Sequence, residues 1–253
     1  MSDASGRIAI TAASAGHAST YAVYGATAPF SLTRYRMAVS DTTSILSSFQ
    51  IATLAQVSNF ALALSAGVEH AVVSSPSGVS LYETPSSDAA TSSSMLGPIA
   101  GLPTDVFRIA AATAEQNAAI GGTNPLAIAM IRPSPNGALV SLVTSLAPLT
   151  ASTPILLPGS AGAASTGSAL SIVAAPGGGV ARFFVAAMDD GGSSSTLRVW
   201  EVISQPPSAR QIVIADDWSF ARSTLSMAVS GTTVRLVEQD NTNALVSRAI
   251  GCR

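Results

Sequence analysis

The sequence repeats one short plan five times, and this repetition constrains the fold more than any other feature. Each unit holds three runs of β-branched, aromatic or aliphatic residues, separated by Gly, Pro, Ser and Asn. Runs of this kind, bounded by turn residues, are typical of strands. The units begin near residues 7, 59, 106, 168 and 223, at intervals of 52, 47, 62 and 55 residues. A period of about 50 residues with several strands per repeat indicates the blades of a β-propeller.

The positions of the strands follow from the same pattern. First strands are expected at 7–14, 59–65, 106–113, 168–175 and 223–229. Second strands are expected at 20–25, 69–74, 126–131, 180–188 and 232–238. Third strands are expected at 31–37, 78–84, 138–144, 196–203 and 243–250. A fourth, outer strand is available in four units, at 48–54, around 95–102, at 153–157 and at 210–214.

The sequence therefore predicts an all-β protein whose residues 1–253 form a single β-propeller domain. About five blades are expected, with six as the alternative count, and each blade has three or four antiparallel strands. A β-sandwich and a β-solenoid remain the rival architectures. Long polar loops at 85–95 and 158–168 are expected to connect blades.

The charge of the chain is low and dispersed. Charged residues make up 10% of the sequence, against about 25% in typical domains, and the formal net charge is −2. All twelve cations are arginines, so a lysine nucleophile is excluded. Binding to nucleic acid by phosphate neutralisation needs clustered cations, and the sequence predicts none.

The hydrophobic residues do not form a membrane-spanning segment. No stretch approaches the roughly 18 uninterrupted apolar residues of a spanning helix. The N-terminal sequence MSDASGRIAI carries an acid early and has no basic region or long apolar run, so it does not resemble a secretion signal. We expect no membrane span and a cytoplasmic or non-classically secreted protein.

Few residues could carry catalysis or hold a metal. Cys252 is the single cysteine, so no disulfide can form within the chain, and with only His17 and His70 no zinc pattern is possible. A nucleophile elbow and a phosphate-binding loop are also missing. The sequence therefore predicts no enzyme, no metal and no cofactor. Because paired carboxylates cannot be placed from sequence, a propeller glycoside hydrolase remains the third interpretation.

One constellation suggests a ligand site. Arg182 and Arg235 lie on the second strands of the last two units, and acidic or Asn-rich turns follow them. The third strand of unit four offers Trp200 and Glu201, and Trp218 lies between the two units. Arg and Glu can hydrogen-bond sugar hydroxyls, while Trp packs on the apolar face of a sugar ring. The predicted ligand-binding residues are Arg182, Glu201, Trp218 and Arg235, the alternative being exposed strand arginines beside tryptophans of the core.

At these residues the chain resembles the fungal fucose-specific lectin family, whose members are six-bladed propellers. Residues 223–248 (STLSMAVSGTTVRLVEQDNTNALVSR) resemble the repeat of that family, and residues 168–201 resemble it more loosely. The resemblance implies a fucose held by Arg182 and Glu201 of one blade and by the aromatic Trp218. In unit five Arg235 matches the arginine position, but the strand that follows lacks the glutamate.

Three functions follow as expectations. The first is a non-catalytic, lectin-like propeller that recognises fucose-type sugars, with a carbohydrate or glycoprotein as partner. The second is a protein-interaction scaffold without sugar binding, and the third is the hydrolase named above. Since the last unit has no room for a fourth strand, its open edge also predicts a homo-oligomer.

Overall fold

The structure is all-β, as the sequence predicted. The computed structural model describes residues 7–12, 17–25, 28–38, 41–65, 67–114, 125–133, 137–146, 149–160, 169–175, 180–190, 195–218, 220–230, 233–240 and 245–251. The described residues form β-strands and no helix, and so none of these segments is a helix able to cross a membrane. By their contacts the residues fall into two compact units, Met1–Ile99 and Ala100–Arg253.

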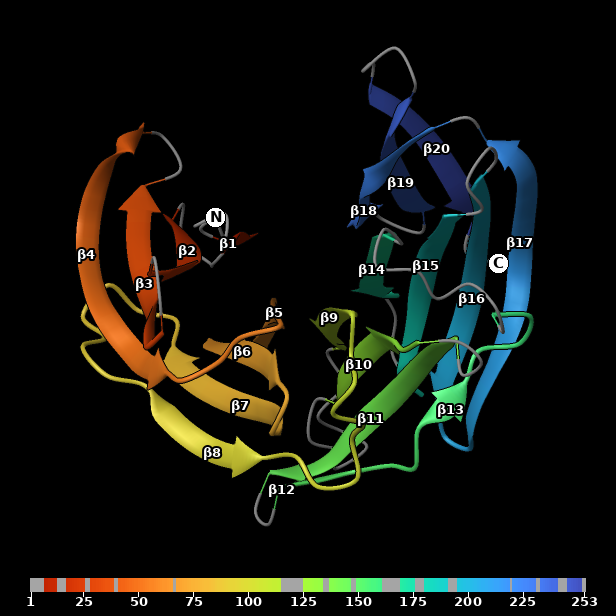
Figure 1. The fold of residues 1–253 in the computed structure, drawn as a ribbon. Coiled ribbons are helices and arrows are strands. Elements are labelled where there is room, and N and C mark those ends of the chain that lie inside the picture. The colour runs from red at the N-terminus through yellow and green to blue at the C-terminus, as the bar shows by residue number, and fades with distance from the viewer. Residues whose placement is uncertain are drawn as a thin grey trace. The chain divides into compact units, whose positions relative to one another are not determined.

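The first unit contains two blades, each an antiparallel meander of four strands (Figure 1). Blade 1 consists of β1 (Arg7–Ala12), β2 (His17–Tyr24), β3 (Phe30–Ala38) and β4 (Asp41–Leu54). Blade 2 consists of β5 (Asn59–Ser65), β6 (Val68–Ser75), β7 (Gly78–Pro85) and β8 (Ser94–Pro98). The first strands of the two blades, β1 and β5, contact each other, as the inner strands of neighbouring propeller blades do.

The second unit contains three antiparallel blades, which have five, four and three strands in the described residues. Blade 3 consists of β9 (Arg108–Thr113), β10 (Leu126–Ile131), β11 (Ala138–Leu146), β12 (Leu149–Ala151) and β13 (Ile155–Leu156). Blade 4 consists of β14 (Ala169–Ala174), β15 (Arg182–Asp190), β16 (Ser195–Ser204) and β17 (Pro207–Trp218). Blade 5 consists of β18 (Phe220–Ser230), β19 (Thr233–Asp240) and β20 (Leu245–Gly251). The inner strand β14 contacts both β9 and β18.

Five antiparallel blades confirm the predicted β-propeller class and the lower of the two expected blade counts. The predicted strands 59–65 and 126–131 coincide with β5 and β10. In blade 3 the expected outer strand 153–157 is replaced by two short strands, β12 and β13, which both pair with β11. The loop predicted at 85–95 does not connect blades, because it joins β7 to β8 inside blade 2.

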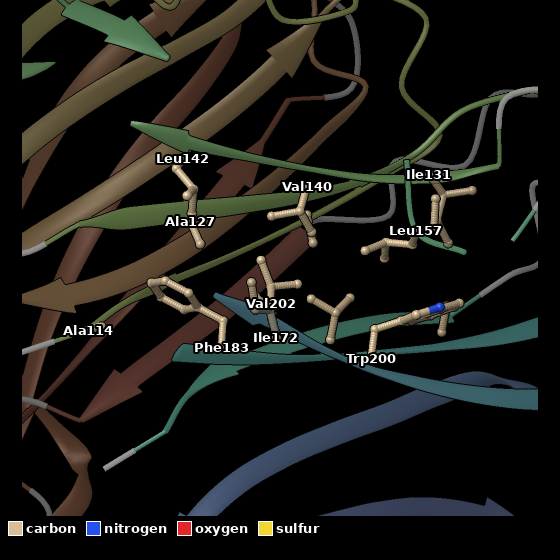
Figure 2. Close-up of a cluster of buried hydrophobic side chains, with 14 of the residues drawn as sticks. Ala114, Ala127, Ile131, Val140, Leu142, Leu157, Ile172, Phe183, Trp200 and Val202 are labelled. Carbon is tan, nitrogen blue, oxygen red and sulfur yellow. The ribbon is translucent and has the colours of Figure 1, made fainter. Parts of the chain in front are cut away.

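The core of the second unit is built from both faces of blade 4. Side chains alternate between the faces of a strand, so Phe183 and Val185 of β15 face blade 3, while Phe184 and Ala186 face blade 5. All four are at most 3% exposed. In Figure 2 the side chains of blade 4, among them Phe183 and Trp200, point toward those of blade 3. A strand buried on both faces needs the continuous apolar run seen at 183–188.

Candidate functional site

Three adjacent strands of blade 4 bring Arg182, Glu201 and Arg210 to one face of the sheet. Glu201 lies opposite Arg210 in the β16–β17 pairing. On its other side Glu201 lies opposite Phe184, two residues along β15 from Arg182, and such diagonal neighbours are within reach of long side chains. Alternation places all three on the face that packs against blade 5. We call these three residues the blade 4 cluster.

Glu201 is the buried centre of the blade 4 cluster. Its side chain is 6% exposed, against 34% for Arg182 and 71% for Arg210. Nη1 of Arg182 donates to Oε1 of Glu201 at 3.3 Å, and Nε of Arg210 donates to Oε2 at 2.6 Å. A buried carboxylate must be paired to be tolerated, and here each oxygen receives an arginine N–H. The glutamate thereby orients two guanidinium groups toward the surface.

The blade 4 cluster offers hydrogen-bond donors at the surface. Two guanidinium groups and one carboxylate leave one surplus positive charge among these residues. A guanidinium has five N–H donors in a fixed fork, and among the described residues each arginine uses one of them on Glu201. The remaining N–H groups can donate to the hydroxyl, carboxylate or sulfate oxygens of a ligand.

The structure does not bring Trp218 to this cluster. The backbone of Trp218 pairs with Ser195, at the opposite end of the β16–β17 ladder from the Glu201–Arg210 pair. Ser195 and Glu201 are six residues apart, which at about 3.3 Å per residue is about 20 Å. The Trp218 side chain itself lies outside the described residues. A sugar held by Glu201 is therefore out of reach of the backbone position from which Trp218 would extend.

Arg235 and Trp200 also lie apart from the cluster. Val234 and Leu236 of β19 are buried against blade 4, so Arg235 between them points to the opposite face of blade 5, where it is exposed. Trp200 is 0% exposed in the core shared with blade 3, and its Nε1 donates to the Pro158 carbonyl at 2.8 Å. Of the four predicted ligand-binding residues, the structure brings together Arg182 and Glu201.

Sequence reasoning missed Arg210, although a signal for it was present. The segment 210–214 was predicted as the fourth strand of its unit. Strands joined by a tight turn pair symmetrically about that turn, and the turn at Gln205 and Pro206 places Ser204 opposite Pro207. Counting outward from this turn pairs Glu201 with Arg210. Predicting this pairing requires knowing at which two residues the chain turns. The composition of the loop does not locate the turn to the residue.

A second group of polar residues, three of them charged, is buried between blades 1 and 2. We call Ser19, Tyr21, Arg34, Arg36 and Glu69 the Glu69 cluster. Arg34 forms two bonds to Glu69, Nε to Oε2 at 2.9 Å and Nη2 to Oε1 at 3.0 Å. Ser19 donates to Oε1 at 2.6 Å and Tyr21 to Oε2 at 2.7 Å. Each member is at most 2% exposed, so the cluster is positioned to join the blades and not to meet a large ligand.

Burial and hydrogen bonding shift two pKa values in the Glu69 cluster. Burial alone would raise the pKa of Glu69, but hydrogen bonds from Arg34, Ser19 and Tyr21 outweigh it, and the pKa lies below its usual 4.5. Burial, followed by the charge of Glu69, raises the pKa of the Tyr21 phenol far above its usual value. Glu69 is therefore ionised and Tyr21 protonated at neutral pH.

A concave surface lies at the other end of the same interface. It has a volume of about 510 Å³, counting its open mouth, between the end of β4 and the β6–β7 hairpin. The described residues of its walls carry no charged side chain and include Thr53, Leu54, Gln56, Val73, Ser80 and Tyr82. We call it the Tyr82 hollow. In the described part of the chain, no three His, Cys, Asp or Glu side chains gather as a metal site would need.

Comparison with known proteins adds two partial structural similarities. No known family matches the sequence, and no curated protein matches it. The fucose-specific lectin of Aleuria aurantia matches 76% of this chain with a TM-score of 0.49 and 13% identity. A mutant GH32 β-fructofuranosidase of Bombyx mori, in complex with sucrose, matches 94% with a TM-score of 0.46 and 9% identity. In each case the match covers 59% of the other protein, and at these values no function is carried over.

Proposed function

We propose that this β-propeller binds carbohydrate without catalysing a reaction, through the blade 4 cluster. The observation that carries the proposal is the placement of Arg182 and Arg210 by the buried carboxylate of Glu201, at 3.3 and 2.6 Å. Polar ligands with several oxygens are recognised by side chains that are held in place before binding, because less conformational entropy is then lost. A fixed pair of guanidinium forks at a surface meets this requirement.

The state of the described buried carboxylates supports binding over hydrolysis. A glycosidase needs one carboxylate free to act as a base or nucleophile and one able to donate a proton. Glu69 and Glu201, the buried carboxylates in the described residues, are each held by arginine. At Glu69 the hydrogen bonds from Arg34, Ser19 and Tyr21 lower the pKa, which opposes the proton uptake that a general acid requires.

A glycan array tests the proposal. The purified chain, applied with the variants Arg182→Ala and Arg210→Ala, is expected to bind a defined class of glycans, and each variant is expected to lose most of that binding. Arg235→Ala is the matched control. It removes an exposed arginine from blade 5, in the same compact unit Ala100–Arg253, but one that points to the face turned away from blade 4. Binding that all three variants retain would place the sugar elsewhere. No binding to any glycan would reject the proposal.

A protein-binding scaffold is the second candidate, and one observation favours it. Ile45 and Leu46 are adjacent on the outer strand β4 and are 58% and 49% exposed. Outer strands with exposed apolar side chains are places where another chain can pair or pack. For this candidate we expect a defined partner protein to co-purify with the native chain and with Arg182→Ala. The Ile45→Glu variant is expected not to retain that partner.

A further inference from the structure

The charge of the blade 4 cluster constrains what it can bind. Arg182 and Arg210 together carry two positive charges against the single negative charge of Glu201. Arg210 is 71% exposed, so the surplus charge lies at the surface. An anionic group placed there would gain charge-assisted hydrogen bonds, which are about twice as strong as bonds between neutral groups.

The acceptors of the cluster are poorly accessible to a ligand, because Glu201 is buried and each of its oxygens already accepts an N–H. Each hydroxyl of a neutral sugar carries a proton to donate as well as lone pairs to accept, and a site for such sugars offers both acceptors and donors. Both oxygens of Glu201 already receive an arginine N–H, and its side chain is 6% exposed. The hydrogen-bonding groups that the cluster can still offer a ligand are therefore mainly N–H donors. A ligand group that only accepts, such as a carboxylate or a sulfate, fits this balance.

The described residues around the cluster offer no aromatic surface for a sugar ring. Phe184, which lies opposite Glu201, is 3% exposed, and Trp200 is buried on the other face of the sheet. The backbone of Trp218 is about 20 Å along the ladder. Stacking would otherwise supply much of the affinity for a neutral sugar. Affinity at this cluster must come mainly from charge and hydrogen bonds.

We infer that the blade 4 cluster selects acidic saccharides, which carry a carboxylate or a sulfate, over neutral ones. This inference rests on the proposed function, since it names the ligand class of the same site. The planar forks of Arg182 and Arg210 suit two oxygens of one acidic group or the acidic groups of neighbouring residues in a polysaccharide. Glu201 acts as a positioning residue that holds both forks.

Matched pairs of glycans test the inference with the whole chain. A homogalacturonan oligomer is titrated beside its fully methyl-esterified form of equal length, and a sulfated oligosaccharide beside its desulfated form, at 50 and 500 mM NaCl. We expect the acidic member of each pair to bind at least about tenfold more tightly at low salt. High salt should remove most of that preference, because exposed charges are screened.

Variants test whether the preference for acidic saccharides comes from the blade 4 cluster. Arg182→Ala and Arg210→Ala are each expected to weaken the acidic ligand about tenfold. Since each variant leaves buried Glu201 with one arginine partner, the chain is expected to stay folded with a modestly lower unfolding temperature. Arg235→Ala should bind as the native chain does. A conservative Arg210→Lys variant keeps the charge and loses the fork, so it should retain part of the affinity.

The outcomes separate the inference from the proposed function. Equal binding of acidic and neutral members, weakened by Arg182→Ala, would overturn the acidic preference and leave carbohydrate binding at this cluster intact. If neutral sugars bind and only Tyr82→Phe weakens that binding, the acidic preference and the carbohydrate site at the blade 4 cluster are both overturned. The site would then lie in the Tyr82 hollow. Equally tight binding of inorganic polyphosphate of matched charge would overturn selection for saccharides. No binding to any glycan would overturn both.

Discussion

Arg34 and Glu69 form a two-bonded ion pair across the interface of the first two blades, with N–O distances of 2.9 and 3.0 Å. Their side chains are 1% and 0% exposed. Two charges removed from water cost several kcal/mol each, and only good geometry with further hydrogen bonds repays this cost. Ser19 and Tyr21 supply those further bonds. We expect the pair to favour one arrangement of blade 1 against blade 2, because other arrangements would leave a buried charge unpaired.

Removing one partner of this pair is expected to be costly. In Arg34→Met the Glu69 carboxylate stays buried with less compensation, and we expect the free energy of unfolding to fall by about 3–5 kcal/mol. The double variant Arg34→Met with Glu69→Met removes both charges, so it is expected to recover part of that loss. Urea denaturation of the three proteins measures both effects. A double variant less stable than Arg34→Met would contradict this account of the interface.

The lowered pKa of Glu69 predicts how stability depends on pH. Its usual pKa is 4.5, and in the folded protein it is lower, so the folded state holds its proton less tightly than the unfolded state. Its contribution is therefore fully present above about pH 4.5 and is lost as the pH falls through the folded pKa. We expect the denaturation midpoint to decline on acidification through this window. In Glu69→Gln the decline should be shallower, and equal slopes in the two proteins would rule out Glu69 as the titrating group.

Asp88 is expected to hold the loop between β7 and β8 against blade 1. Its Oδ1 accepts from Nε of Arg36 at 2.7 Å, and Oδ2 contacts Nδ1 of His17 at 2.8 Å. The hydrogen bond from Arg36 is the main cause that lowers the pKa of Asp88. Because Asp88 is 45% exposed, its bonds are worth little individually. In Asp88→Asn we expect amide exchange in residues 86–93 to rise about two- to fivefold, as followed by mass spectrometry.

A matched control for this loop exists in the second unit. Asp105 is equally exposed and is paired with Arg132 at 2.7 Å. Asp105→Asn should leave exchange in residues 86–93 unchanged. If both variants accelerate exchange in that loop to the same extent, the effect is a general loss of stability and the contact with Arg36 does not explain it.

Two glycines with similar backbone angles should respond differently to alanine. Gly67 has φ +84° and open space where a Cβ would be added. Gly137 has φ +67°, and an added Cβ would overlap the backbone carbonyl of Ser160. We expect Gly67→Ala to cost about 1–2 kcal/mol for the left-handed backbone alone. Gly137→Ala should cost about 1–3 kcal/mol more, because the packed loop must move.

The loop beside Gly137 is held too firmly to adjust easily. Ser160 is 0% exposed, and its Oγ donates to the Leu157 carbonyl at 2.6 Å and accepts from the Ala138 amide at 3.1 Å. Comparing the denaturation midpoints of the two alanine variants checks the difference. Equal midpoints would show that this loop yields without cost.

Much of the fold could be predicted because its signals are local. Apolar alternation and turn residues placed β5 and β10 at their observed bounds, and spacing of about 50 residues indicated the blades. The outer strand of blade 3 was less predictable: β12 and β13 are three and two residues long, too short for a periodic pattern. Of the site, the sequence predicted that Arg182, Glu201 and Trp218 would converge; the structure brings Arg182 and Glu201 together, Arg210 was missed, and the backbone of Trp218 lies at the other end of the ladder.

The sequence by itself determined the fold class, since period-2 patterns and turn residues depend only on near neighbours along the chain. The tertiary structure alone decided which charged groups meet between blades. Arg34 and Glu69 are 35 residues apart and lie on different blades, and neither segment indicates the other. Strand register likewise decided that Glu201 meets Arg210 while Trp218 lies at the far end of the same ladder. The physical reason is that a shift of one residue in register moves a side chain to the opposite face, and the register depends on the exact residues at which the chain turns and on the packing of the buried face.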